Sequence, residues 1–219
     1  MNNFAAPNSA SSQGFRLILA STSRYRAELL GRLQLPFEQL APDCDETPLP
    51  AETPEALVRR LSEIKAISVL DQLAEASSHR DESAALIVVI GSDQVADCDG
   101  RVLGKPHTAE RAHEQLSLMS GQDVVFRTGL CVATSQPSGK SATTVDVVNV
   151  TARFRELGSD EIERYVSREK PLDCAGSFRS EALGISLLSA LDGNDPNALI
   201  GLPLIQLAAR LRGLGLQVP

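Results

Sequence analysis

Tryptophan is absent from the 219-residue chain, and aromatic residues make up only 4% of it. Hydrophobic residues still amount to 42%, so the predicted core rests on leucine, isoleucine, valine and alanine. No apolar run approaches the roughly 20 residues that a membrane helix needs, and residues 1–14 lack the basic and apolar segments of a secretory signal. The sequence therefore predicts a soluble, cytoplasmic protein that does not enter a membrane.

A basic excess is missing as well. The chain has 28 acidic against 21 basic residues, a net charge of −7 and an isoelectric point near 5.0. Proteins that bind nucleic acid along its backbone usually carry a broad basic face. We therefore expect no nucleic-acid partner, although a local basic pocket stays open.

The four cysteines are widely spaced, with no C-x-x-C pair and no histidine at metal-ligand spacing. Such spacing is typical of a reduced protein without a zinc site. We expect all four to fill space in the interior: Cys44, Cys98, Cys131 and Cys174.

Helix-like and strand-like hydrophobic patterns alternate along the chain, which predicts an α/β fold with a mixed sheet. Residues 1–14, rich in asparagine, alanine and serine, are predicted to form a disordered leader. The expected strands are 16–20, 37–40, 86–90, 123–134 and 143–155, with a hairpin turn at Asp99-Gly100. The expected helices are 24–33, a stretch from Thr53-Pro54, 109–119, a short stretch from Ser159 and one from Pro203 to about 213. Residues 75–83 are expected to form a surface connection.

The first candidate site lies between the expected strand 16–20 and the helix after it. Ser21, Ser23 and Arg26 stand there. Hydroxyls, free N–H groups at a helix start and a guanidinium together suit a phosphate group. Since Ser23 is also the natural N-cap of the helix, a plain cap followed by surface arginines is the alternative.

The second candidate is Asp93, shortly after the apolar run 86–90. Such a run is typical of a central strand buried on both faces, and ligands of open α/β sheets bind at the carboxyl ends of strands. We therefore expect Asp93 at the end of a buried strand, where its carboxylate accepts a proton from water or helps to hold a cation. A carboxylate that caps a turn is the alternative.

Two lysines are further candidates. Lys105 follows the predicted hairpin on a loop stiffened by Gly104 and Pro106, and Lys65 lies at the edge of the apolar stripe of the second helix. Either ammonium can neutralise a phosphate. The alternative for both is a surface lysine whose stem lies along apolar side chains.

Three later segments are rich in turn-forming residues. The segment 174–181 combines glycine, serine and arginine before Glu181, which suits a loop against a polar ligand. The turns at 192–197 and 200–203 are expected to serve structure alone.

No one of these segments is decisive, but their combination and order resemble the Maf family of nucleotide pyrophosphatases. The resemblance extends from Arg16 to about Leu216 and rests on six ordered motifs: LILASTSRYRAELL, APDCDETP, IGSDQV, LGKP, AGSFRSEALGI and DPNALIGLPLI. It implies an elongated, twisted mixed sheet flanked by helices, as in Maf proteins and inosine triphosphatases. It also implies a single domain over 15–219 with two lobes and a central cleft, and by family analogy a homodimer.

The resemblance implies that Asp93 is the proton acceptor that activates water to cleave between the α- and β-phosphates of a nucleoside triphosphate. Nucleoside monophosphate and pyrophosphate are then released. Phosphate binding falls to Ser21, Ser23, Arg26, Lys65 and Lys105. A divalent cation, Mg²⁺ or Mn²⁺, is expected at Asp93 and Glu46, with Glu46 as the candidate second carboxylate.

Tyr25, Gln94 and Glu181 match the positions that set substrate specificity in the family. They resemble the branch that acts on 7-methyl-GTP, whereas branches preferring dTTP and UTP have Asp-Thr where this chain has Asp93-Gln94. Methylation at N7 makes guanine a cation, which suits an aromatic face and a nearby carboxylate. We expect Tyr25 to stack on the base, Glu181 to accept from the guanine N1–H and N2 amino group, and Gln94 to fix the orientation.

Two other functions stay open. One is hydrolysis of dTTP or UTP, and the other is a non-catalytic nucleotide-binding role in cell division, because the family is also linked with septum formation. A pure nucleotide binder has little need for a carboxylate base beside the phosphates, so Asp93 favours the enzyme.

Overall fold

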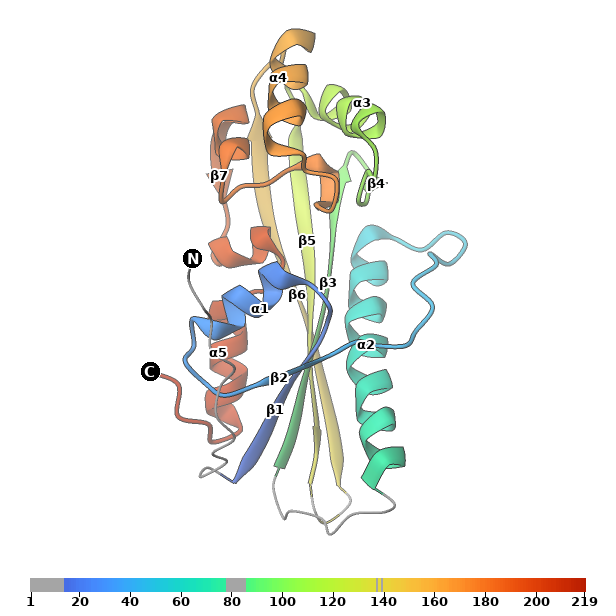
Figure 1. The fold of residues 1–219 in the computed structure, drawn as a ribbon, viewed down its shortest axis with the longest axis vertical. Coiled ribbons are helices and arrows are strands. Elements are labelled where there is room, and N and C mark those ends of the chain that lie inside the picture. The colour runs from blue at the N-terminus through green and yellow to red at the C-terminus, as the bar shows by residue number, and fades with distance from the viewer. Residues whose placement is uncertain (1–13, 78–85, 137, 139) are drawn as a thin grey trace.

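The computed structural model describes residues 14–77, 86–136, 138 and 140–219. All of the predicted leader except Gly14 lies outside these residues. A long, twisted sheet runs through the molecule, with helices on both of its faces (Figure 1). The described part has seven strands: β1 (Phe15–Ala20), β2 (Glu38–Leu40), β3 (Leu86–Cys98), β4 (Arg101–Leu103), β5 (Asp123–Ser135), β6 (Ser141–Phe154) and β7 (Leu188–Asp192).

The strands follow the order β2-β1-β3-β5-β6-β7, and β4 pairs with β3 off this path. β1 is parallel to both of its neighbours, and all other pairs are antiparallel. The parallel pairs are joined through helical crossovers, as parallel strands require. The predicted mixed α/β sheet is therefore confirmed.

Among the described residues, five α-helices flank the sheet: α1 (Arg24–Gly31), α2 (Pro54–Ser77), α3 (Ala109–Met119), α4 (Ser159–Glu169) and α5 (Leu204–Gly213). Three of them begin at the expected caps, because the hydroxyls of Ser23, Thr53 and Thr108 each accept from the backbone N–H three residues on. None of the helices in the described ranges is long and apolar enough to span a membrane.

Alternate residues of β3 face opposite cores. Val88 and Ile90 pack beneath α1 and α5, whereas Val89 packs beneath α2 on the other face. A separate cluster, which includes Phe126 and Ile162, joins α3 and α4 to the far end of the sheet (Figure 1). The two ends of the sheet thus have cores of their own.

Asp93 lies in the middle of β3 rather than at a strand end, which corrects our expectation. The apolar run stops at Ile90, but β5 continues to pair with β3 from Ile87 to Asp97. The buried Ser92 is accommodated because its hydroxyl hydrogen-bonds the backbone oxygen of Gly201 at 2.9 Å. Backbone pairing with a neighbouring strand therefore extends β3 beyond its apolar run.

Several short elements were not predicted. They are β7 and three 3₁₀-helices: η1 (Ala175–Ser177), η2 (Leu183–Leu187) and η3 (Pro196–Ile200). At three to five residues, they are too short for a hydrophobic period to develop. The predicted connection 75–83 begins later than expected because α2 continues to Ser77, and residues 78–83 lie outside the described ranges.

One interval of β3 has an open edge. β1 pairs with β3 as far as Gly91, and β4 begins to pair at Ala96. Among the described strands, none pairs with residues 92–95 on this side. Asp93 and Gln94 therefore lie where the sheet is locally one strand short.

Candidate active site

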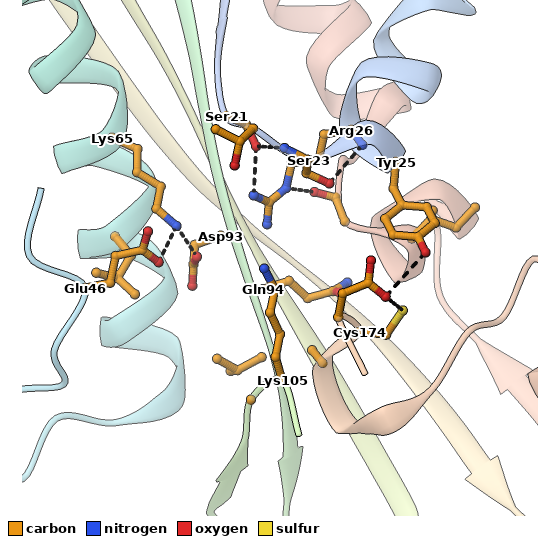
Figure 2. A pocket seen from close by; sticks show the side chains of 18 of the residues that line it. Ser21, Ser23, Tyr25, Arg26, Glu46, Lys65, Asp93, Gln94, Lys105 and Cys174 are labelled. Atoms are coloured by element: carbon orange, nitrogen blue, oxygen red, sulfur yellow. Dashed lines mark hydrogen bonds and ion pairs between the residues drawn. The ribbon is translucent and has the colours of Figure 1, made fainter. Parts of the chain in front are cut away.

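A cavity of about 660 Å³ occupies this part of the molecule (Figure 2). Its volume falls within the usual range for small-molecule sites. The lining comes from the turn after β1, α1, the acidic turn before α2, α2, β3, the loop after β4, the segment after α4 and the turn around η3. All ten residues predicted for the site line it: Ser21, Ser23, Tyr25, Arg26, Glu46, Lys65, Asp93, Gln94, Lys105 and Glu181.

Lys65 joins two carboxylates at one side of this cavity (Figure 2). Its ammonium lies 2.7 Å from Asp93 Oδ1 and 2.7 Å from Glu46 Oε2. The side chains of Lys65 and Asp93 are only 7% and 10% exposed, while that of Glu46 is 55% exposed. The surface-lysine alternative is therefore wrong for Lys65, whose charge acts in a partly dehydrated site where Coulomb interactions are stronger than in water.

Two glycines let α2 approach the sheet closely enough for this contact. A Cβ atom at Gly91 would lie 2.1 Å from the backbone oxygen of Ser62, and one at Gly129 would lie 2.1 Å from that of Val58. No larger side chain fits at either position without moving the helix. The glycines therefore determine how far Lys65 stands from the strand.

Arg26 enters the cavity from the first turn of α1. Its Nε donates to the backbone oxygen of Gly201 at 3.0 Å, and Nη1 lies 3.4 Å from Ser21 Oγ. Burial lowers the pKa of the Arg26 guanidinium, and attraction to Asp93 and Glu46 opposes that shift. No carboxylate of the described residues is in ion-pair contact with Arg26, so part of the guanidinium is left for an anionic ligand.

Ser21 and Ser23 shape the turn that leads into α1. Ser23 caps the helix, with 3.4 Å between its Oγ and the backbone nitrogen of Arg26, while its own N–H donates to Ser21 Oγ at 3.1 Å. The capping alternative is thus confirmed for Ser23. It leaves the anion-binding expectation open, because the capped first turn itself lines the cavity.

Gln94 ties β3 to the turn that carries η3. Its Nε2 lies 2.6 Å from the backbone oxygen of Ala198, 3.1 Å from that of Leu199 and 3.0 Å from Thr128 Oγ1. Backbone oxygens only accept, and the Thr128 hydroxyl already donates to Ala198. The amide nitrogen must therefore face this cluster, which leaves Oε1 as the free acceptor.

The turn around η3 belongs to the site, which corrects the expectation that residues 200–203 serve structure alone. Leu199, Ile200 and Gly201 line the cavity, and the oxygen of Gly201 holds both Arg26 and Ser92. These contacts use backbone oxygens, which every residue type supplies. No sequence signal could have revealed them.

The opposite side of the cavity is built around the ring of Tyr25 (Figure 2). The guanidinium carbons of Arg24 and Arg179 lie 4.7 and 5.3 Å from the ring centroid. The phenol accepts from Arg24 at 2.7 Å and lies 3.5 Å from Asp173 Oδ1, and burial raises its pKa. Arg179 also binds Glu181 at 3.1 Å. Sequence reasoning missed Asp173 and Arg179 as site residues, although Arg179 lies within the expected ligand loop.

The cysteines divide into two pairs. All four are free, and Cys98 and Cys131 are buried as expected, but Cys44 and Cys174 are only partly buried. The prediction that all four fill the interior is therefore wrong for these two. Cys174 lines the cavity, where burial raises the pKa of its thiol to about 12, so the thiol is protonated at neutral pH.

The charged residues of the site form two groups, one with an excess of positive charge and one with an excess of negative charge. In the group that includes Asp93, three cations face two carboxylates: Arg26, Lys65 and Lys105 against Glu46 and Asp93. In the group joined to Tyr25, the lining carboxylates of Asp173 and Glu181 face one lining guanidinium, that of Arg24, and the adjoining ion pair between Arg179 and Glu169 adds no net charge. A ligand with an anionic tail and a cationic head matches this arrangement.

Glu46 and Asp93, the two carboxylates expected to hold a cation, both converge on Lys65 Nζ. In the described ranges no group of three or more His, Cys, Asp or Glu side chains is arranged to hold a metal. Mg²⁺ commonly uses one or two protein carboxylates and takes its other oxygens from phosphates and water. The pair therefore fits a cation that arrives together with a phosphate ligand.

Residues 16–214 match the family model described as Maf-like protein. A 7-methyl-GTP pyrophosphatase of Nitrosococcus oceani is 52% identical over 202 residues, covering 92% of this chain and 94% of that protein. A 7-methyl-GTP pyrophosphatase of Xanthomonas campestris is 50% identical over 204 residues, covering 93% and 98%. The solved Ham1 protein of Staphylococcus aureus aligns over 90% of this chain and 98% of its own, with 15% identity and a TM-score of 0.40.

Proposed function

The chain belongs to the Maf family, and from this premise we propose that it hydrolyses 7-methyl-GTP to 7-methyl-GMP and pyrophosphate. Such an activity removes modified nucleotides from the cytoplasmic pool. The observation that carries the proposal is the site of Asp93, a buried carboxylate held by Lys65 in a cavity that also contains Arg26. Relatives about 50% identical over nearly the whole chain are named for this reaction.

In the proposed reaction the oxygen of a water molecule attacks the α-phosphorus, the α–β anhydride bond breaks and pyrophosphate leaves. Asp93 accepts the proton of that water. Lys65 binds Oδ1 of Asp93 at 2.7 Å, which leaves Oδ2 as the oxygen that takes the proton. Holding the base in one orientation is what general-base catalysis requires.

Charge neutralisation is the other requirement of phosphoryl transfer. We assign it to Arg26, Lys65 and Lys105, with Ser21, Ser23 and the first-turn N–H groups of α1 as hydrogen-bond donors to phosphate oxygens. A divalent cation held by Glu46 and Asp93 would supply further neutralisation of phosphate charge when bound. Substrate phosphates would supply its further oxygens, since two carboxylates of the described residues face Lys65.

The nucleobase of the substrate is assigned to the side of the cavity around Tyr25. Tyr25 is the aromatic group on this side, and an electron-poor, cationic 7-methylguanine stacked on its ring would lie near the guanidiniums of Arg24 and Arg179. Glu181 uses Oε1 to bind Arg179, so Oε2 is free to accept from the base. Gln94 presents Oε1 as a further acceptor, which suits the N–H-rich edge of guanine.

A panel of nucleoside triphosphates, offered with Mg²⁺ or Mn²⁺ while released pyrophosphate is measured, tests this proposal. We expect 7-methyl-GTP to be hydrolysed with the highest kcat/KM. Faster turnover of dTTP or UTP would move the chain to the other branch of the family. Tight nucleotide binding without pyrophosphate release would favour the non-catalytic role in cell division instead.

A further inference from the structure

We propose that Arg179 and Glu169 are positioning residues that hold Tyr25 and Glu181 in a fixed relation for base recognition. The proposal rests on the function proposed above and deepens it. Neither residue touches the reacting phosphates in this scheme. Their role is to determine where the two base-contacting side chains stand before the nucleotide arrives.

Arg179 contacts both members of the base-contacting pair. Its Nε lies 3.1 Å from Glu181 Oε1, and its guanidinium carbon lies 5.3 Å from the centroid of the Tyr25 ring. A third contact anchors it, because Nη1 lies 2.8 Å from Glu169 Oε1. One planar group thus meets two carboxylates along its edge and an aromatic ring, a combination that a lysine ammonium cannot reproduce.

Glu169 accepts hydrogen bonds from residues on both sides of Glu181. It is the last residue of α4, and its side chain is only 10% exposed. Oε1 accepts from Arg179, and Oε2 accepts from the backbone N–H of Leu183 at 3.1 Å. A single carboxylate therefore ties down the residues two before and two after Glu181.

Hydrogen bonds also hold the backbone of residues 179–184, the segment that carries Glu181. The N–H of Arg179 donates to the buried Tyr165 hydroxyl at 3.1 Å, and its oxygen accepts from the N–H of Gly184 at 3.1 Å. A Cβ atom at Gly184 would lie 2.4 Å from that same oxygen. The loop that carries Glu181 is therefore compact, with little freedom left at its ends.

Two physical consequences follow. A side chain that is already ordered loses less conformational entropy on binding, so the held pair favours affinity for the base. In addition, the positive charge of Arg179 is shared between two carboxylates. Glu169 supplies the second of these, which leaves negative charge at Glu181 for a cationic base.

The test compares kcat and KM for 7-methyl-GTP and GTP in the full-length protein and four variants. Arg179→Ala should raise KM for 7-methyl-GTP about tenfold, the change expected when one charge-assisted hydrogen bond is lost. The kcat should change less than KM, and KM for GTP should rise less. Arg179→Lys and Glu169→Gln should show the same shift in smaller size.

Arg153→Ala is the matched control. Arg153 also has two carboxylate partners, Asp123 at 3.6 Å and Asp192 at 2.7 Å, but neither of them lines the cavity, whereas Arg179 binds the lining residue Glu181. Removal of Arg153 should leave both KM values unchanged. Melting temperatures of all variants separate a loss of folding from a loss of positioning, and Arg179→Lys decides the matter if Arg179→Ala does not fold.

An Arg179→Ala enzyme that is folded and keeps its KM overturns the proposal, as does an equal loss of kcat on both nucleotides without a change in KM. If the wild-type protein prefers another nucleotide, the same variants are measured with that nucleotide. A rise in KM for Arg179→Ala over Arg153→Ala then supports the positioning role while the 7-methyl-GTP assignment fails. If KM of Arg179→Ala does not exceed that of Arg153→Ala, both the positioning role and the 7-methyl-GTP assignment are refuted.

Discussion

Replacing Gly91 by alanine tests how the packing of α2 determines the geometry of the site. The added methyl group would lie 2.1 Å from the backbone oxygen of Ser62 and 2.9 Å from the backbone nitrogen of Ala66. Both are helix backbone atoms that no side-chain rotation can remove. To reach an ordinary contact distance, helix and strand must separate by about 1 Å or more. Lys65, one residue before Ala66, then moves away from Asp93.

The Gly91→Ala substitution should lower both stability and turnover. Overpacking of this kind lowers the free energy of unfolding by about 1–3 kcal/mol, which for a chain of this size lowers the melting temperature by roughly 2–4 °C per kcal/mol. A displacement of about 1 Å at a catalytic group is expected to lower turnover about 100-fold. Activity should therefore fall much further than the fraction of folded protein explains.

The assay combines a melting curve with pyrophosphate release at a temperature well below the melting transition. Gly31→Ala is the control, because a Cβ atom there meets nothing within 4 Å and the residue ends α1. It should retain both stability and activity. A Gly91→Ala protein that melts and turns over like wild type would show that α2 can relax without disturbing the contact between Lys65 and Asp93, and the packing account would be refuted.

Three further predictions concern the chemistry. Asp93→Asn should lower pyrophosphate release about 10²–10⁴-fold while the melting curve is retained; near-normal release removes Asp93 from the role of base. Tyr25→Leu should raise KM for 7-methyl-GTP several-fold more than KM for GTP, because the cation–π contribution is lost, and equal effects on both nucleotides contradict stacking on a cationic base. Chelation of divalent cations should abolish turnover, with recovery on adding Mg²⁺ or Mn²⁺, and should leave the melting temperature unchanged because Lys65 already pairs with both Glu46 and Asp93. Turnover in excess chelator counts against the cation.

Much of the fold could be predicted because its elements carry local signals. The apolar run before Gly91 marked β3, and the caps Ser23, Thr53 and Thr108 marked helix starts. The extent of β3 could not be predicted, since it depends on pairing with β5, a contact between distant parts of the chain. The 3₁₀-helices could not be predicted because they span three to five residues, which is too short for a hydrophobic period to show in the sequence.

Some features of the candidate site could likewise be predicted from the sequence, and others could not. Ionic and hydroxyl side chains such as Lys65 and Ser21 could be named in advance because their chemistry suits phosphate, and Asp93 because a carboxylate suits a proton or a cation. The ion pair between them could not, because it depends on how closely α2 packs on the glycines of the sheet. The contributions of the Gly201 oxygen and of Arg179 were hidden for a related reason. Gly201 acts through a backbone oxygen that every residue type supplies, and the partners of Arg179 depend on how the chain folds.

A competition assay tests the central claim most directly. Equal concentrations of 7-methyl-GTP and dTTP are given together to the wild-type protein with Mg²⁺, and the two nucleoside monophosphates are separated and quantified at early times. Their ratio reports the ratio of the two kcat/KM values in one vessel. The account predicts that 7-methyl-GMP accumulates first, with one pyrophosphate for each molecule formed. Faster formation of thymidine monophosphate, or no pyrophosphate from either nucleotide, would contradict it.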